Sequence, residues 1–543
     1  MGFARVNLMV RMIKRWLLFP YILSGLLVPN SHEKSVYQYF KKMHRPASGT
    51  RDVVLVQCVE DIYYFSLFGR VITSLREQCP IRVEQFVLNS LRSGESGSLK
   101  GFLHVRFING LVGKKWVGLY KSFCDCVGYR STGLRFPFGD AIDAFRAVKC
   151  WRGLYNNDAL NSLAIDEVPV GDLVNDSYLR FKPAATVDLE DTYLWLIIWQ
   201  AYRDIRRAKY YFPRVRPKLF LTSYSSYIQH GIAVRVALQH GVRVFSFGNY
   251  QEPAKELTLT DWTHTKNTDD YADRFSMLEN HDQKLAEAEA ALAARMSGTI
   301  DSATAYMKKS AYAETEEPVP DVRGAAVIFL HDFFDSPHVY RDMVFPDFWE
   351  WACFTIETLE QANTHFFIKP HPNQIDLSSG VLNDLIRRYP AIRMISPNIT
   401  NKQLAQAGLA CAVTVYGTVA HEMAYLGVPT IGCGDNPHIS FDFCKTAKNK
   451  TEYAELLKES GQLNFDKPAM KRQSLIFYYM HNLNSGAEEK SLLDAVAKLR
   501  NDCGDPALNN QMLDESLGNI SALRGFNAFI SGLAGVITTN EHA

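Results

Sequence analysis

Several patterns that mark common protein classes are missing from this chain of 543 residues. Its ten cysteines are scattered and form no Cys-x-x-Cys pair, while Cys124 and Cys126 stand too close together for an ordinary disulfide bond. Neither a zinc site nor a disulfide framework is predicted, and a reducing cytoplasm is the simplest compartment. The 59 lysines and arginines nearly balance 58 acidic residues, and a formal charge of +1 argues against a general polyanion binder such as a nucleic-acid protein.

The apolar run near the amino terminus is short. Residues 16–29 number about fourteen, too few to span a bilayer easily, and no convincing small-x-small cleavage site follows them. Four basic residues precede the run: Arg5, Arg11, Lys14 and Arg15. We predict that this segment holds the protein peripherally on an anionic inner-membrane surface, and a terminal helix packed on the first domain is the alternative.

Length and composition are those of a globular protein with more than one domain. With 47% hydrophobic and 22% charged residues, the chain is long enough to bury two or more cores. We divide it into a basic and apolar extension, a first domain, a helical linker, a second domain and a helical tail, at residues 1–50, 51–265, 266–320, 321–485 and 486–543. The linker is predicted because residues 270–313 are rich in alanine, glutamate and lysine.

Strands and helices alternate in the first domain. The apolar pattern predicts strands at residues 53–57, 81–87, 218–223 and 242–247, with helices at 64–77 and 228–240. This alternation is typical of a Rossmann-like domain. Residues 100–200 are rich in aromatic side chains and yield no strand order. The serines from Ser223 to Ser226 follow a strand and form a weak candidate for the acceptor side of a site.

The same alternation continues between residues 325 and 432, with polar side chains where the strands end. One strand leads into Lys369 and His371, and the prolines on both sides of His371 restrict its backbone. A later strand, residues 410–416, is followed by Gly417, Thr418 and a helix over residues 419–426. This predicts a second domain with its ligand at the carboxyl edge of a parallel sheet.

The turn at Gly417 and Thr418 is predicted to bind an anion. Gly417 lets the backbone approach a ligand, Thr418 can cap the helix, and free N–H groups at the helix start face a phosphate. Glu422 lies one turn into the helix, where its carboxylate can reach the hydroxyls of a ribose attached to that phosphate.

The loop at residues 331–338 gathers chemically active side chains at another strand end. His331 and Asp335 are candidates for proton transfer, and Ser336 and His338 for binding donor phosphate or acceptor hydroxyls. The loop lacks a recognisable metal-ligand spacing. A capped turn with solvated polar residues is the structural alternative.

Lys369-Pro-His-Pro372 followed by Tyr416-Gly-Thr-Val-Ala-His-Glu-Met-Ala-Tyr-Leu-Gly-Val-Pro429 resembles the nucleotide-sugar half of GT-B glycosyltransferases. The resemblance is to bacterial capsule and lipopolysaccharide enzymes with a His-Pro motif, including those that transfer Kdo and sialic acid. It implies two Rossmann-like domains facing a cleft, with the nucleotide sugar in the second, the acceptor in the first, and a helical tail packed back on the first. It also implies that His371 contacts donor phosphate or sugar, Gly417 and Thr418 the phosphate, and Glu422 the ribose, with Lys369 beside them.

Sugar transfer requires stabilisation of a departing nucleotide and removal of a proton from an acceptor hydroxyl. GT-A enzymes usually hold a metal with Asp-x-Asp, and this chain has no such motif, so we expect a metal-independent reaction without a cofactor. Glu60 and Asp61, just beyond the first strand, are candidates for the catalytic base, and a polar turn into a helix is the alternative.

The resemblance therefore predicts a glycosyltransferase that acts on a glycan or lipid-linked acceptor in bacterial surface polysaccharide synthesis, with a mild preference for CMP-linked sugars. Two alternatives stay open. One is an enzyme like UDP-GlcNAc 2-epimerase, which shares the fold but needs no acceptor. The other is a non-catalytic module that binds a nucleotide sugar or a glycan within an assembly complex.

Overall fold

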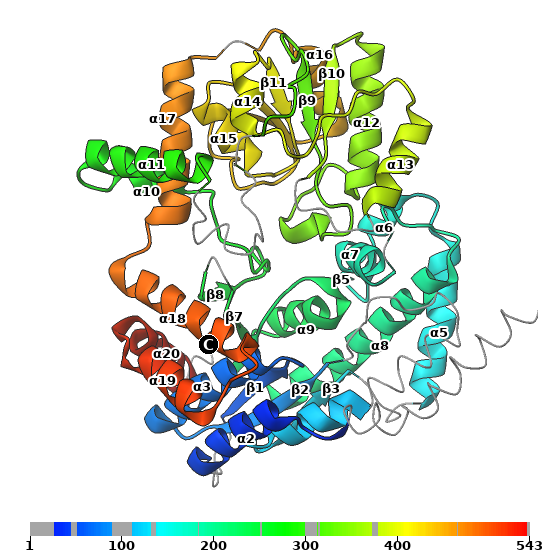
Figure 1. The fold of residues 1–543 in the computed structure, drawn as a ribbon. Coiled ribbons are helices and arrows are strands. Elements are labelled where there is room, and N and C mark those ends of the chain that lie inside the picture. The colour runs from blue at the N-terminus through cyan, green and yellow to red at the C-terminus, as the bar shows by residue number, and fades with distance from the viewer. Residues whose placement is uncertain are drawn as a thin grey trace, which may run out of the picture.

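The structure is a computed structural model that describes residues 27–44, 52–88, 111–131, 137–182, 184–249, 252–298, 312, 315–371, 378–463 and 465–539. Two α/β domains lie one above the other in Figure 1, each built on its own sheet. Most of the amino-terminal segment predicted to bind a membrane, including all four of its basic residues, lies outside the described ranges.

The first domain contains a six-stranded sheet with the order β3-β2-β1-β6-β7-β8. Its strands are β1 (Val53–Cys58), β2 (Arg82–Val87), β3 (Cys126–Arg130), β6 (Leu219–Thr222), β7 (Arg243–Phe247) and β8 (Ala254–Leu257). All pairs are parallel except β7 with β8, which closes one edge antiparallel. Strand β1 is buried throughout because helices cover both faces of the sheet, which explains its continuous apolar sequence.

Successive side chains of β1 belong to different cores, as the alternation of a strand requires. Val54 and Val56 pack with α3 and α2, while Leu55 packs on the other face with α7, α8 and α9. The helices of this domain include α2 (Ser31–Met43), α3 (Ile62–Gln78), α5 (Pro137–Arg152), α6 (Asn157–Asn161), α7 (Gly171–Phe181), α8 (Thr192–Val215) and α9 (Tyr227–Gln239). Strands β4 (Ala164–Ile165) and β5 (Val168–Pro169) form a small hairpin between α6 and α7.

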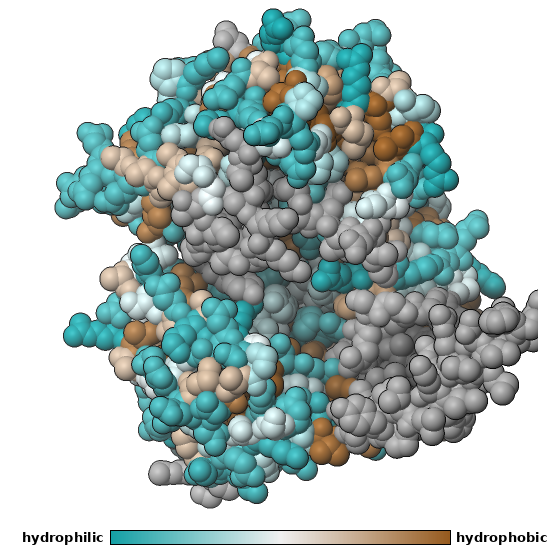
Figure 2. All heavy atoms as spheres, in the orientation of Figure 1, coloured by the Kyte–Doolittle hydropathy of each residue, from teal (hydrophilic) through white to brown (hydrophobic). Residues whose placement is uncertain are grey.

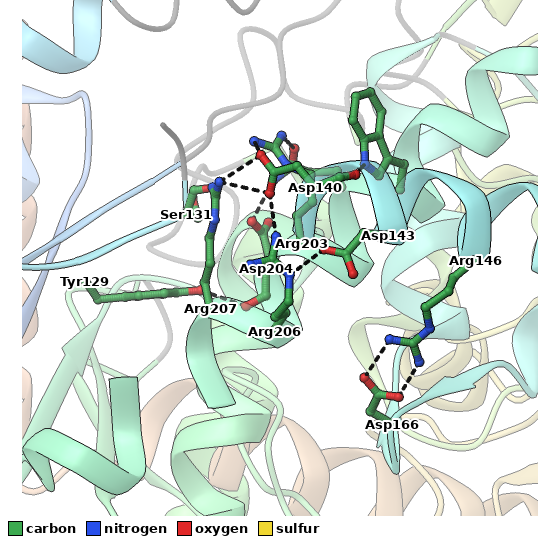
Figure 3. Close-up of polar contacts among 12 residues, drawn as sticks. Tyr129, Ser131, Asp140, Asp143, Arg146, Asp166, Arg203, Asp204, Arg206 and Arg207 are labelled. Atoms are coloured by element: carbon green, nitrogen blue, oxygen red, sulfur yellow. Dashed lines mark hydrogen bonds and ion pairs between the residues drawn. The ribbon is translucent and has the colours of Figure 1, made fainter. Parts of the chain in front are cut away.

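A network of arginines and aspartates holds α5 against α8 (Figure 3). Arg203 and Arg207 of α8 lie 2.8 and 3.2 Å from the Asp140 carboxylate of α5. Arg206 contacts both Asp140 and Asp143, the latter at 2.7 Å. Burial alone would raise the pKa of Asp140, but the three guanidinium groups hold it below its usual value. The network of three arginines and two aspartates acts as a clasp between the two helices.

The helices at the carboxyl terminus complete the core of the first domain. They are α18 (Ala487–Gly504), α19 (Asn510–Ala522) and α20 (Arg524–Thr538), and they lie beside α3 in Figure 1. Leu499, Leu517 and Ile530 share one hydrophobic cluster with Val54. These helices thus follow the second domain in sequence and belong to the first domain in space.

The second domain contains a five-stranded parallel sheet with the order β10-β9-β11-β12-β13. Its strands are β9 (Ala326–Phe329), β10 (Phe366–Lys369), β11 (Cys411–Val413), β12 (Thr430–Cys433) and β13 (Cys444–Ala447). Its helices are α12 (Phe348–Gln361), α13 (Ser378–Arg388), α14 (Asn401–Gln406), α15 (Val419–Tyr425), α16 (Lys450–Lys458) and α17 (Lys467–Tyr478), with a 3-10 turn η1 (Pro337–Val339) and a π-helical turn η2 (Tyr479–Leu483).

The segment predicted to link the domains packs largely on the second one. Helices α10 (Tyr271–Ser276) and α11 (His281–Met296) share a hydrophobic cluster with α17. Leu292 of α11 and Phe477 of α17 are both buried in it. The predicted architecture of two Rossmann-like domains is confirmed by the two sheets and the helices on their faces.

Two features relate to membrane contact: the hydropathy of the surface, and the length and apolar character of the helices. On the face shown in Figure 2, hydrophilic side chains cover much of both domains. Across the described ranges, no single helix has the length and apolar character needed to cross a membrane. Helices α19 and α20 pass that test only as a pair, and they are bent by 72° relative to each other.

Candidate functional site

The strand order of the second domain places a cavity at the carboxyl ends of its central strands. The chain leaves β9 toward β10 on one side and reaches β11 on the other, so β9 and β11 flank a topological switch point, where open α/β sheets bind ligands. A cavity of about 110 Å³ lies there, and we call it the second-domain cavity. Its polar lining residues are Tyr312, His331, Lys369, His371, Asn401, Thr414, Thr418 and Glu422. The structure thus brings together the predicted donor residues Lys369, His371, Gly417, Thr418 and Glu422.

Lys369 is the last residue of β10 and is 5% exposed. Its Nζ donates a hydrogen bond to the carbonyl of Pro397 at 3.3 Å. Burial lowers the pKa of Lys369 to about 8, although the Glu422 carboxylate opposes that shift. Burial also lowers the pKa of His371, two residues further along. The cavity therefore combines a buried amine with an imidazole, and both suit contact with a phosphate.

Gly417 is required where it stands because a larger residue would clash. A Cβ atom on Gly417 would lie 2.9 Å from Oγ1 of Thr414. Thr418 occupies the position before α15, but it has helical backbone angles and makes no side-chain hydrogen bond to the helix. The predicted cap at Thr418 is therefore wrong, because a threonine in that conformation does not direct its hydroxyl at the free N–H groups.

Glu422 is buried on α15 with both carboxylate oxygens engaged. One oxygen accepts a hydrogen bond from the hydroxyl of Tyr312 and the other from Nδ2 of Asn401, each at 2.7 Å. Tyr312 and Asn401 were missed in the sequence because they lie 110 and 21 residues from Glu422 and no motif surrounds them. They fix the orientation of the carboxylate, which lines the cavity.

His331 follows β9 and reaches the same cavity, but its surroundings differ from those of a proton-transfer group. Its ring stacks on Phe348 at 4.6 Å, and its Nε2 lies 3.1 Å from Oγ1 of Thr414. Burial lowers the pKa of His331 to about 3, with a further contribution from His371. The ring is therefore neutral near pH 7 and serves as a hydrogen-bonding wall of the cavity.

A second cavity, of about 340 Å³, lies between the domains, and we call it the interdomain cavity. The first domain supplies its lining through α7, α9 and the loops after β6 and β8, and the second domain through residues 338–343. His338 lines this cavity and places its Nδ1 2.7 Å from Oδ1 of Asp176 on α7. Burial alone would lower the pKa of His338, but Asp176 raises it above its usual value.

The other residues of the 331–338 loop lie elsewhere. Ser336 donates a hydrogen bond from its hydroxyl to that of Tyr227 at 2.7 Å, so it ties the domains together and lines neither cavity. Asp335 is exposed and also lies outside both cavities. Ser336 and His338 were predicted to lie with the donor residues, but the structure places neither of them in the second-domain cavity.

Glu60 and Asp61 follow β1 at the switch point of the first sheet, and they line neither cavity. Asp61 caps α3 by accepting hydrogen bonds from the backbone N–H groups of Tyr63 and Tyr64, at 2.8 and 3.2 Å. The geometry therefore supports the alternative given for Asp61, a polar turn that leads into a helix. Of the serines after β6, Ser225 and Ser226 do line the interdomain cavity.

Most lining residues of the interdomain cavity have no counterpart in the sequence predictions, among them Asp172, Asp176, Arg235 and Trp262. Asp172 and Asp176 lie in the stretch between residues 100 and 200, where no strand pattern could be read. Their partners are distant in sequence, since Asp176 and His338 are 162 residues apart. No local motif could have indicated them.

Comparisons with known proteins give faint likenesses only. No protein-family model and no curated protein matches the sequence. Among solved structures, Thermosulfurimonas dismutans KpsC, a beta Kdo 2,4 transferase, is 11% identical with a TM-score of 0.29, over 49% of this chain and 79% of that one. The UDP-GlcNAc 2-epimerase of Methanocaldococcus jannaschii is 12% identical with a TM-score of 0.24, over 78% and 97% of the two chains. Anabaena Alr3699/HepE, solved with UDP and glucose, is 10% identical with a TM-score of 0.22, over 86% and 99%. Scores this low carry no argument about activity, and the fold rests on the two sheets described above.

Proposed function

We propose that this protein is a glycosyltransferase of the GT-B type that moves a sugar from a nucleotide-sugar donor to a glycan or lipid-linked acceptor. We further propose a role in bacterial surface polysaccharide synthesis, in the cytoplasm or on the inner face of the membrane, and a reaction that needs no metal. A CMP-linked donor is mildly preferred because of the His-Pro motif. These finer points rest on the sequence resemblance.

The observation that carries the proposal is the convergence of five residues from two separate sequence motifs on one cavity at a switch point. Lys369 supplies positive charge, and Lys369 and His371 supply hydrogen bonds, for a pyrophosphate or phosphate. Gly417 allows the ligand close to the backbone. The Glu422 carboxylate, held by Tyr312 and Asn401, is placed to accept hydrogen bonds from ribose hydroxyls. A nucleotide is the ligand that uses all of these groups together.

The interdomain cavity favours transfer over epimerisation. An epimerase acts on one nucleotide sugar and needs no second binding site. Here a larger cavity, lined by both domains, lies apart from the second-domain cavity and is lined by different residues. The presence of two cavities supports a reaction with two substrates, a donor and an acceptor.

The first test is a thermal-shift screen of the purified protein with CMP, CDP, UDP and GDP. A ligand at 100 times its dissociation constant adds about 2.7 kcal/mol to the free energy of unfolding, which such a screen detects. We expect one nucleotide to stabilise the wild type and neither His371→Ala nor Glu422→Gln. The matched control is His365→Ala, an exposed histidine just before the same strand β10, which should keep the full shift.

The result separates the candidates. No shift with any nucleotide would refute the nucleotide-sugar proposal. A shift together with turnover of the nucleotide sugar alone would favour the epimerase. Nucleotide binding without turnover, even when acceptors are present, would favour the remaining alternative, a non-catalytic binding module.

A further inference from the structure

The interdomain cavity holds an aspartate–histidine pair that crosses between the domains. Asp176 comes from α7 of the first domain and His338 from η1 of the second, and both side chains are nearly buried, at 3% and 6% exposure. Asp176 accepts the hydrogen bond from Nδ1, which fixes the neutral imidazole in the tautomer whose Nε2 carries the lone pair. Within the described part of the chain Nε2 has no hydrogen-bond partner, and His338 lines the cavity.

The two arginines that line the cavity are already paired with carboxylates. Arg235 forms a two-pronged ion pair with the Asp172 carboxylate, one contact being 2.7 Å. Arg341 lies 3.6 and 3.8 Å from carboxylate oxygens of Asp269 and Asp435. Among the described lining residues there is no lysine and no arginine outside these pairs. A phosphate or carboxylate would therefore find no free cation here, whereas an uncharged ligand would be accommodated.

Two residues of the lining each carry a buried polar atom without a partner. Nε of Arg235 and Oδ1 of Asn161 make no hydrogen bond within the described residues. Buried polar groups are nearly always satisfied, so these atoms are an unsatisfied donor and an unsatisfied acceptor in residues that border the cavity. Trp262, which stacks on Arg235 at 4.9 Å, adds an aromatic surface to the same wall.

Tyr416 lies between the linings of the two cavities. It packs against His331 of the second-domain cavity at 4.7 Å and against Tyr340 of the interdomain cavity at 5.1 Å. The Tyr416 hydroxyl donates a hydrogen bond to the carbonyl of Ser336, two residues before His338. The linings of the two cavities are therefore in contact through one aromatic side chain.

We infer that the interdomain cavity holds an uncharged sugar acceptor and that His338 removes the proton from its attacking hydroxyl. This inference rests on the proposed transfer reaction. The acceptor proton passes to Nε2 of His338 as the acceptor oxygen bonds to the anomeric carbon of the donor. The bond from that carbon to the phosphate oxygen breaks, and its electron pair leaves with the nucleotide. Asp176 is a positioning residue that orients the ring and stabilises the imidazolium formed.

The experiment uses the nucleotide sugar whose nucleotide stabilises the protein. Nucleotide release is measured with a panel of uncharged mono- and disaccharides and, separately, with glycerol phosphate and sugar phosphates. We expect only the uncharged panel to stimulate release. His338→Gln should lose at least 100-fold of the stimulated rate while keeping the thermal shift with nucleotide, and His240→Gln, an exposed histidine at the end of α9, should match the wild type.

Two further variants separate a chemical role from a structural one. Asp176→Asn should move the rising limb of the pH–rate profile to lower pH, because it removes the charge that raises the pKa of His338. Trp262→Ala should raise the acceptor KM about tenfold with little change in kcat, and it tests the cavity even if the His338 variant folds poorly.

Unchanged turnover in His338→Gln, or equal stimulation by phosphorylated acceptors, would overturn the inference while leaving the donor site intact. Absence of any nucleotide shift would overturn the proposed function, and the inference with it.

Discussion

Acid should destabilise this protein through its buried histidines, and His438 allows the effect to be measured. His438 is 1% exposed, and its Nε2 lies 3.2 Å from Nδ1 of His421 in a cluster with Phe477. Burial lowers its pKa to about 3, with a further contribution from His481. An unfolded histidine has a pKa of about 6.5. Between these values the unfolded chain binds the proton and the folded chain does not, so stability falls as the pH drops from 6.5 toward 3.

The magnitude follows from the same two values. At pH 5 the unfolded state gains about 2 kcal/mol from protonating this one ring, and at pH 7.5 it gains almost nothing. His438→Gln keeps a hydrogen-bonding group near the position of Nε2 but cannot titrate. The substitution itself changes the free energy of unfolding at both pH values, and this change cancels in the comparison. When the pH is lowered from 7.5 to 5, the variant should lose about 2 kcal/mol less unfolding free energy than the wild type.

The assay is urea unfolding at both pH values, with the exposed His365→Gln as a control that should follow the wild type. Equal losses in the wild type and His438→Gln, within about 0.5 kcal/mol, would refute the reasoning. They would mean that His438 is protonated in the folded protein or neutral in the unfolded one.

Three other perturbations test the fold and the second-domain cavity. Asp140→Asn removes the shared partner of the buried arginines on α8 and should lower the free energy of unfolding in urea by about 3–5 kcal/mol. The control Asp166→Asn, at the exposed pair with Arg146 (Figure 3), should lower it by less than about 1 kcal/mol. Equal losses in the two variants would contradict the role of the clasp. Gly417→Ala should abolish the nucleotide shift because its Cβ would meet Thr414, while Gly380→Ala, which meets nothing within 4 Å, should preserve it. Because the pKa of Lys369 is about 8, the amine loses its charge as the pH rises from 7 to 9, and nucleotide affinity should fall. Isothermal titration of the wild type and of Lys369→Met measures this, and the variant should not show the fall.

The sequence predicted those parts of the fold that depend on local pattern. Buried parallel strands are continuous apolar runs, so β1 and β6 were found within one or two residues of their ends. The second-domain cavity was predictable for the same reason, because Lys369 ends β10, while His371 and Gly417 lie two and four residues beyond the ends of β10 and β11. What could not be predicted depends on contacts between distant segments. Asp176 and His338 meet only because the two domains do, and Thr418 fails as a cap because of backbone angles that its neighbours in sequence do not reveal.

The return of the carboxyl-terminal helices to the first domain has a consequence for how the protein is made. While the ribosome is still translating the second domain, the apolar face of β1 has α3 beside it but not α18, α19 and α20. At elongation rates of about 5–20 residues per second, that face waits for tens of seconds before its last helices emerge. The nascent first half therefore needs protection by a chaperone until translation has ended, and a messenger truncated after the second domain would yield an aggregating product.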